Sequence, residues 1–198
     1  MRAFLAVLPP DSVVADLDAF LQPRREADTE HLWRWSRPEQ LHLTLAFLAD
    51  LPDWQEEPLV EALTGWAARH PALRMSLGTG GAFPDPAQAK VLWVGVPEEQ
   101  ARQDLTAWAG QLRQLANRHG GDVDGMRFSP HVTVARSGRR RTAGRWVQAL
   151  DSYRSASFDV THVHLVQSHL GEGPGRRPRY EVRASAELGP APEGEPPR

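Results

Sequence analysis

Cysteine is absent from this chain of 198 residues, and Lys90 is the single lysine among 23 basic residues. The lack of cysteine excludes disulfides, thiolate nucleophiles and cysteine-based zinc sites together. No apolar run reaches the roughly 18 residues that a membrane-spanning helix needs. The formal net charge of −2 excludes a protein that coats nucleic acid through its overall charge.

The charge that is present is unevenly distributed. Between Met126 and Arg183, 11 arginines stand against 4 acidic residues. For any one arginine a solvated basic face is the simpler interpretation. The cluster as a whole would suit a partner that carries phosphate.

The two ends of the chain are simple. In the first residues, MRAFLAVLPPDS, two prolines interrupt the apolar run and no small-residue cleavage site follows, so we expect a first strand and a cytoplasmic protein. The segment GPAPEGEPPR has no large apolar side chain and predicts a disordered tail over 189–198. Residues 1–188 are expected to form one domain, with a polar loop over Gly171–Arg179 between two strands.

A repeat runs through this domain. The segments FLAVLPPDSVVADLDAFL and LWVGVPEEQARQDLTAWAGQLRQL each begin as an apolar strand, turn at proline and continue with helical spacing. A His-x-Thr segment follows each of them: LHLTLAF contains His42, 33 residues after Pro9, and PHVTVAR contains His131, 34 residues after Pro97. Beyond each motif we expect a helix and two strands, over 56–69, 73–83 and 90–96 in the first half and over 142–150, 158–168 and 179–188 in the second.

The duplication predicts an α+β protein with two pseudo-symmetric lobes, each an antiparallel sheet backed by helices, with a cleft between them. Side chains at i and i+2 share one face of a strand. His42 and Thr44 therefore point to one side, as do His131 and Thr133. The apolar residues between them would pack under a helix, which leaves two histidines and two threonines around one concave site.

Two histidines across a cleft suit a reaction that needs one base and one acid. An ordinary pKa near 6.5 would let one imidazole be neutral while the other is protonated. Threonine hydroxyls can donate hydrogen bonds to phosphate oxygens, so cleavage of a phosphodiester fits the motif. Arg136 reaches the cleft only if its strand twists or ends near Ala135, because a regular strand would point it to the other face.

Structural and metal-binding interpretations stand beside this one. A single His-x-Thr on a strand is usually structural, but two copies in a duplicated frame favour a function. His42 and His131 would supply only two metal ligands, and neither motif contains a carboxylate, so we expect no metal and no cofactor. His162, His164 and His169 resemble a ligand set, yet we expect partly exposed residues of one strand.

Aromatic residues offer candidate contacts for a base. Packing in the core is the better expectation for Trp33, Trp35, Trp93 and Trp108. Phe47 and Tyr180 are better placed for the rim of the cleft, where a ring can stack on a base.

The chain resembles the 2H phosphoesterase superfamily, named for two His-x-Thr/Ser motifs, and within it the RNA 2′,3′-cyclic phosphodiesterases, also called 2′-5′ RNA ligases. The resemblance extends to about Leu188. It lies in RAFLAVLPP, WSRPEQLHLTLAFL, GAFPDPAQAKVLWVGV, FSPHVTVAR, VHLVQSHL and RYEVRASAEL. The first motif continues as FLAD where the family commonly has FLG, so the loop after Phe47 is expected to differ in shape.

The resemblance implies a bilobal fold with the cleft between the lobes, and it implies roles for five residues. His42 and His131 would be catalytic, and Thr44 and Thr133 would bind phosphate. The family's second motif often extends to His-x-Thr-x-x-Arg, which adds Arg136 to the phosphate site. By analogy His42 is the acid and His131 the base, although the near-symmetry of the lobes leaves the opposite assignment open.

The implied activity is metal-independent hydrolysis of RNA 2′,3′-cyclic phosphate ends to 2′-phosphomonoesters. RNA ends or nucleoside 2′,3′-cyclic phosphates would be the partners of a monomer that needs no membrane and no other protein. Joining of ends in a 2′-5′ linkage without ATP is a reverse reaction to test. The alternatives are another 2H substrate, such as a 2′-5′ oligonucleotide or a cyclic nucleotide phosphate, and a non-catalytic RNA- or nucleotide-binding module.

Overall fold

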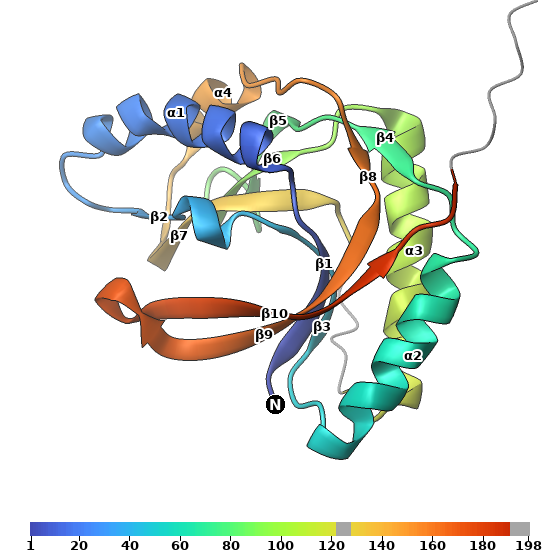
Figure 1. Cartoon of the computed structure of the whole chain (residues 1–198). Coiled ribbons are helices and arrows are strands. Elements are labelled where there is room, and N and C mark those ends of the chain that lie inside the picture. The colour runs from blue at the N-terminus through green and yellow to red at the C-terminus, as the bar shows by residue number, and fades with distance from the viewer. Residues whose placement is uncertain (122–127, 191–198) are drawn as a thin grey trace, which may run out of the picture.

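One antiparallel sheet of eight strands forms the centre of the protein in a computed structural model that describes residues 1–121 and 128–190 (Figure 1). Its strands are β1 (Ala3–Val7), β2 (Arg34–Trp35), β3 (Leu43–Leu48), β5 (Gly78–Phe83), β6 (Ala89–Gly95), β7 (His131–Arg141), β9 (His162–Gly173) and β10 (Arg177–Glu187). Their order is β10-β9-β1-β3-β7-β6-β5, and β2 pairs with β7. β3 and β7 share one pair of opposed residues, Leu43 and Val132. The sheet therefore has two halves, which meet where the two motifs lie side by side.

The described chain contains four α-helices, two for each half of the sheet: α1 (Asp11–Ala27), α2 (Glu56–Ala67), α3 (Glu99–Arg118) and α4 (Gly144–Asp151). α2 and α3 lie together beside β3, β9 and β10, whereas α1 and α4 lie over the half that contains β5 and β6 (Figure 1). The Phe20 ring of α1 lies 4.8 Å from Tyr153, just after α4. α1 follows β1 and α3 follows β6, so each repeat contributes a helix to the opposite half.

Helical spacing of apolar residues explains why these segments are helical. In α3, Leu105, Trp108 and Leu112 are buried, as one face of a helix requires. The helix ends at Arg118, and Gly120 then takes φ +75°, a left-handed conformation that glycine adopts without strain. The α+β fold class predicted from the repeat is confirmed.

The strands expected over 73–83 and 158–168 are each two strands, which corrects the prediction. β4 (Leu73–Met75) and β8 (Phe158–Val160) leave the main sheet and pair with each other, and β5 and β9 follow them. Between β4 and β5 the backbone N–H groups bond to side chains and not to a neighbouring strand. Ser76 N–H donates to the Glu98 carboxylate, and Leu77 N–H donates to Ser155 Oγ at 2.9 Å. The same break in both halves supports the duplication.

The polar loop expected over Gly171–Arg179 is also corrected, because β9 runs to Gly173 and β10 starts at Arg177. Only the turn η3 (Pro174–Arg176) separates them. The polar side chains of this segment form ion pairs on the exposed hairpin. Arg179 contacts Glu172 at 3.1 Å and Glu181 at 3.2 Å. Polarity here marks a hairpin exposed to solvent and not a loop.

The apolar faces of the two motif strands lie in the core. Leu41, Leu43 and Leu45 are buried, as are Val132 and Val134, which confirms the predicted alternation up to these positions. Trp33, Trp35 and Trp108 are buried, as expected, whereas Trp93 is half-buried.

Gly189, the first residue of the predicted tail, is hydrogen-bonded to residues that follow α2. Its N–H donates to the carbonyl oxygen of His70 at 2.8 Å, and its own carbonyl accepts from Ala72 N–H at 3.1 Å. Of the predicted tail, residues 191–198 lie outside the described residues.

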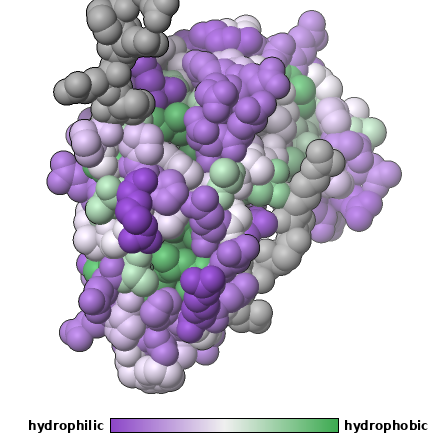
Figure 2. All heavy atoms as spheres, turned by 90° about the vertical axis from the view of Figure 1, so that its right-hand side faces the viewer, coloured by the Kyte–Doolittle hydropathy of each residue, from purple (hydrophilic) through white to green (hydrophobic). Residues whose placement is uncertain are grey.

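The outer face of the α2–α3 half is mainly hydrophilic, with apolar atoms visible only between polar ones (Figure 2). Among the described residues, no helix is long and apolar enough to cross a membrane.

Candidate active site

The two motifs lie side by side because their strands, β3 and β7, pair at one position. Leu43 lies opposite Val132, and each is the central residue of a His-x-Thr motif. In an antiparallel pair this register places His42 beside Thr133 and Thr44 beside His131. The cavities agree with it: a small one is lined by His42 and Thr133, and a large one of about 1310 Å³ by Thr44 and His131. The structure thus brings together the four residues that the sequence predicted for one site.

The two imidazoles make equivalent hydrogen bonds to the backbone. The Nδ1 of His42 lies 2.8 Å from the carbonyl oxygen of Gln40, and the Nδ1 of His131 lies 2.7 Å from that of Ser129. A carbonyl only accepts, so Nδ1 carries the hydrogen in each ring. Nε2 is left in both rings as the nitrogen that can give or take a proton.

The surroundings of His42 disfavour its charged form. Its ring stacks on Phe4 with centroids 4.5 Å apart, and Tyr180 meets it edge-on at 5.1 Å. Burial is the main cause that lowers the pKa of His42, to about 4, and the positive charges of Arg136 and His131 lower it further, while the hydrogen bond to Gln40 opposes the shift.

His131 has a corresponding environment. Phe83 meets its ring edge-on at 4.9 Å, and Trp93 lies 6.0 Å away. Burial and then the charge of Arg136 lower the pKa of His131, against its hydrogen bond to Ser129. Both shifts favour the neutral ring, so the cleft without a ligand disfavours a protonated imidazole more than ordinary pKa values would. One neutral and one protonated imidazole during a reaction stays a prediction.

A β-bulge brings Arg136 to the cleft. Leu92 of β6 lies opposite Ala135, and its neighbour Trp93 lies opposite Thr133, so Val134 has no opposed residue in β6. The extra residue reverses the alternation of faces: Val134 and Ala135 are both buried, and Arg136 is exposed. Nη2 of Arg136 lies 3.4 Å from Thr133 Oγ1. The sequence pattern left the position of the Arg136 side chain open. The bulge is the irregularity of the strand that lets this side chain reach the cleft.

The other motif strand has a bulge at the equivalent position. Leu5 of β1 lies opposite Ala46 and Ala6 lies opposite Thr44, which leaves Leu45 without an opposed residue. In each repeat the bulge lies two residues before a side chain at the cleft. This side chain is Phe47 in the first repeat and Arg136 in the second.

The two ends of the cleft consequently differ. Phe47 lines the large cavity, together with Phe83 and Phe128. Tyr180 lines the small cavity, together with Arg136 and the arginines Arg34 and Arg177. Phe47 and Tyr180 therefore line different cavities, although both pack against the buried cluster of Phe4, Ala6 and Val166, and their contact with a base stays a prediction.

Sequence reasoning missed several residues of this site. Phe4 and Phe83 set the environment of the histidines, and the carbonyls of Gln40 and Ser129 orient them. The sequence position of these carbonyls could have indicated them, because each belongs to the second residue before its histidine. Trp93, assigned to the core, contacts His131 instead.

His162, His164 and His169 line neither of the two cavities at the motifs. His162 and His164 are half-buried neighbours on β9 with ring centroids 5.9 Å apart, as expected for residues of one strand. His169 contacts Glu172 and Glu181. In the part of the chain that the structure describes, no group of three or more histidine or carboxylate side chains could hold a metal ion.

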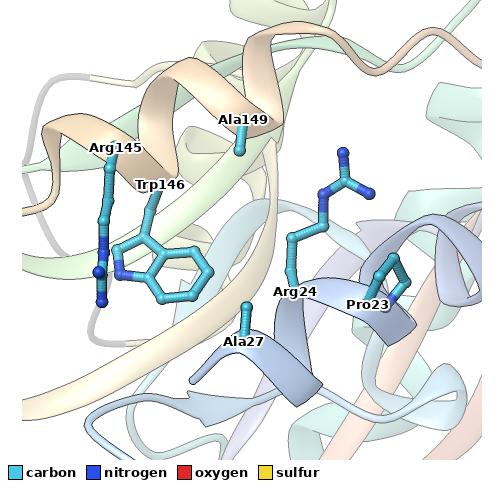
Figure 3. Close-up of a pocket in the computed structure, with 6 residues that line it drawn as sticks. All are labelled: Pro23, Arg24, Ala27, Arg145, Trp146 and Ala149. Carbon is cyan, nitrogen blue, oxygen red and sulfur yellow. The ribbon is translucent and has the colours of Figure 1, made fainter. Parts of the chain in front are cut away.

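A further pocket lies between α1 and α4 (Figure 3). Its lining residues are Pro23, Arg24, Ala27, Arg145, Trp146 and Ala149. Neither motif contributes to it, and these residues include no candidate acid or base.

Known proteins resemble this chain in sequence. The family model of the 2′-5′ RNA ligase superfamily matches residues 9–172. A Geobacillus stearothermophilus protein named RNA 2′,3′-cyclic phosphodiesterase is 31% identical over 162 residues, 81% of this chain and 49% of that protein, so the chain spans about half of that relative's length. An Archaeoglobus fulgidus protein of the same name is 30% identical over 173 residues, 86% of this chain and 92% of that one.

A solved structure extends the likeness to the fold. The crystal structure of Escherichia coli LigT complexed with 3′-AMP has a TM-score of 0.70 and 25% identity, and the match covers 94% of this chain and 97% of that one. The family model and the similar relatives show that the chain belongs to the 2′-5′ RNA ligase superfamily.

Proposed function

We propose that this protein hydrolyses RNA 2′,3′-cyclic phosphate ends to 2′-phosphomonoesters. The observation that carries the proposal is the pair of imidazoles on adjacent antiparallel strands, each held through Nδ1 by the carbonyl two residues earlier. Relatives from Geobacillus and Archaeoglobus bear the name RNA 2′,3′-cyclic phosphodiesterase, and LigT was crystallised with a nucleotide, 3′-AMP.

The reaction assigns opposite tasks to the two histidines. One Nε2 takes a proton from water as the water oxygen attacks phosphorus. The other Nε2 gives a proton to the 3′ oxygen as the bond between it and phosphorus breaks. The product is a 2′-phosphomonoester with a free 3′ hydroxyl. The two Nε2 atoms together carry one proton after the reaction, as they did before it. By resemblance to the family, His42 is the acid and His131 the base.

Charge on the phosphate is stabilised by groups that stand beside each histidine. Thr133 lies beside His42 and Thr44 beside His131, so each hydroxyl can donate to a non-bridging oxygen. Arg136 adds a guanidinium next to Thr133. No step of this scheme requires a metal ion, because the donors and the arginine hold the developing charge.

Substrate binding also supplies the protonation state. In the free protein the pKa values of both histidines are lowered. A phosphate anion between the rings favours the charged form of the nearer imidazole and raises its pKa. The acid therefore acquires its proton together with the substrate.

Other substrates and a function in binding alone remain alternatives. A 2′-5′ oligonucleotide or a cyclic nucleotide phosphate would use the same groups, and reverse 2′-5′ ligation would follow the same steps backward. A binding module without turnover would not need two Nε2 atoms in one cleft. The cytoplasmic location, the monomeric state and the extent of the domain remain predictions.

The test is incubation with a nucleoside 2′,3′-cyclic phosphate in EDTA, with product analysis by phosphorus NMR. We expect the 2′-phosphomonoester, and we expect no product from the double variant His42→Ala, His131→Ala. Binding without turnover would favour the module, and a 3′-phosphomonoester would contradict the direction of opening.

A further inference from the structure

Four arginines gather at one end of the catalytic cleft. The small cavity that contains His42 is lined by Arg34, Arg136 and Arg177. A neighbouring cavity of about 460 Å³ contains Arg37 and shares Trp35, Ser36 and Arg177 with the first. The two cavities thus adjoin along one wall and form a path that leads away from the phosphate site.

Two of these arginines are placed directly against each other. β2 and β7 pair with Arg34 opposite Arg136. Like charges at opposed positions of a sheet are destabilising, so this pair costs stability unless an anion lies between the guanidinium groups. Partial burial and the positive charges of Arg37 and Arg34 also lower the pKa of Arg177.

The acidic residues nearby do not neutralise this end. Asp28 accepts from the N–H groups of Leu32 and Trp33 and from the indole of Trp35. Asp18 pairs with Arg25 at 2.7 Å. Glu39 is exposed and opposes the lowering of the Arg177 pKa.

The four arginines keep their charge available for a ligand. Within residues 1–121 and 128–190, no ion pair within 4 Å joins Arg34, Arg37, Arg136 or Arg177 to a carboxylate. One of them, Arg177, donates to the carbonyl oxygen of Trp35, which fixes its position without cancelling its charge.

The large cavity on the other side of the motifs is lined differently. Phe47 occupies the position equivalent to Arg136, and Phe83 and Phe128 line this cavity next to His131. Its basic residues are on β6 and α3 and not on a motif strand: Lys90, Arg102 and Arg113, together with the acidic Glu99. Arg136 lies on a motif strand itself, close to Thr133 and opposite Arg34, so the arginines of the small cavity adjoin the phosphate site directly.

We propose that Arg34, Arg37 and Arg177 bind phosphodiesters on the 5′ side of the terminal cyclic phosphate, so that the preferred substrate is an oligonucleotide end and not a free nucleoside 2′,3′-cyclic phosphate. The proposal rests on the proposed function of the same site. Arginine is suited to this task because its planar fork of donors matches phosphate oxygens. Binding is sequence-independent, since these contacts reach only the backbone.

The experiment compares kcat/KM for a tetranucleotide that ends in a 2′,3′-cyclic phosphate with kcat/KM for the mononucleoside cyclic phosphate. The ratio is measured for the wild type, Arg37→Gln and the double variant Arg34→Gln, Arg37→Gln. Arg69→Gln serves as the matched control, because Arg69 is exposed beyond the end of α2. Phosphate contacts also predict a salt dependence, with a slope that falls by about 0.7 in log–log form for each contact removed from a single strand.

We expect the wild type to prefer the tetranucleotide. Arg37→Gln should lower the ratio roughly two- to fivefold, as for an exposed ion pair, and the double variant should lower it further and flatten the salt dependence. Arg69→Gln should leave the ratio at the wild-type value. Equal kcat/KM for both substrates in the wild type, or equal losses on both in the double variant, would overturn the inference while the proposed function stands. Failure of the wild type to open either cyclic phosphate would instead refute the proposed function.

Discussion

His42 is the residue at which protonation should destabilise the fold most clearly. Burial against Phe4 lowers its pKa from 6.5 to about 4 in the folded protein. The unfolded chain keeps a pKa near 6.5, so below that pH it binds the proton more tightly than the folded state does. The free energy of unfolding therefore falls as the pH drops from 6.5 toward 4. The two pKa values give a loss of about 2 kcal/mol at pH 5 and about 3 kcal/mol at pH 4.

Urea unfolding from pH 7.5 to pH 5 measures this loss. The comparison is between the wild type and His42→Gln, whose amide cannot titrate in this range but can still donate a hydrogen bond to the carbonyl of Gln40. Subtracting the two free energies of unfolding at each pH removes the groups that both proteins share. The wild type should lose about 2 kcal/mol more than the variant over this interval.

Parallel curves, with a difference constant to within about 0.5 kcal/mol, would refute the reasoning. An NMR titration of the His42 imidazole gives an independent check. A midpoint at or above 6.5 in the free protein would mean that Phe4 and Tyr180 do not keep water away from the ring. Added inorganic phosphate should move the midpoint upward, because an anion in the cleft favours the charged imidazole.

Three further predictions concern the phosphate site. Thr44→Val and Thr133→Val should each lower kcat by roughly 10²–10³, as for loss of one oxyanion donor, and near-normal steady-state rates in both would show that the hydroxyls face elsewhere. Arg136→Ala should raise KM and lower kcat, and Arg136→Lys should restore only part of the loss, since lysine lacks the planar fork; full rescue by lysine would leave charge alone as its role. Turnover should be unchanged in EDTA, and activity that EDTA abolishes and a divalent ion restores would contradict the metal-free scheme.

The paired motif was predictable because chemistry and periodicity coincide there. Alternation along a strand gave the common face of His42 and Thr44, and the duplication gave the second pair. The register of Leu43 against Val132 could not be read from one sequence, because it depends on how the two half-sheets dock. The bulge at Val134 has the same origin, since a residue without a partner is defined by the neighbouring strand and not by its own.

Polarity misled the prediction of the hairpin between β9 and β10. Its residues resemble a loop because both faces of the projecting hairpin carry charged side chains, and their partners, such as Glu172 for Arg179, lie on the opposite strand. Arg34 and Arg177 were overlooked for a related reason. They are far apart in the sequence and line one cavity only in the folded chain, where Arg177 at the start of β10 donates to the carbonyl oxygen of Trp35 in β2. A count of arginines along the chain therefore shows an excess without showing where these side chains come together.

The last prediction assigns the acid and the base. His42→Ala and His131→Ala should each lower the rate by roughly 10²–10⁴, and the double variant should lose little more than the worse single one, because both residues act in one step. The free-state pKa of about 4 means that His42, as the acid, must gain its proton from solution when the phosphate binds. Proton uptake on binding is therefore expected, and calorimetry in buffers of different ionisation enthalpy measures it.

A substrate with sulfur at the bridging 3′ position separates the two roles. A thiolate leaves without a proton much more readily than an alkoxide, because a thiol has a pKa of only about 8.5. The sulfur substrate should therefore rescue His42→Ala, which lacks the acid, and should not rescue His131→Ala, which still lacks the base for water. Rescue of His131→Ala alone would reverse the assignment, which the equivalent Nδ1 hydrogen bonds of the two rings make geometrically acceptable. Full activity of either single variant on the oxygen substrate would refute the two-histidine mechanism itself.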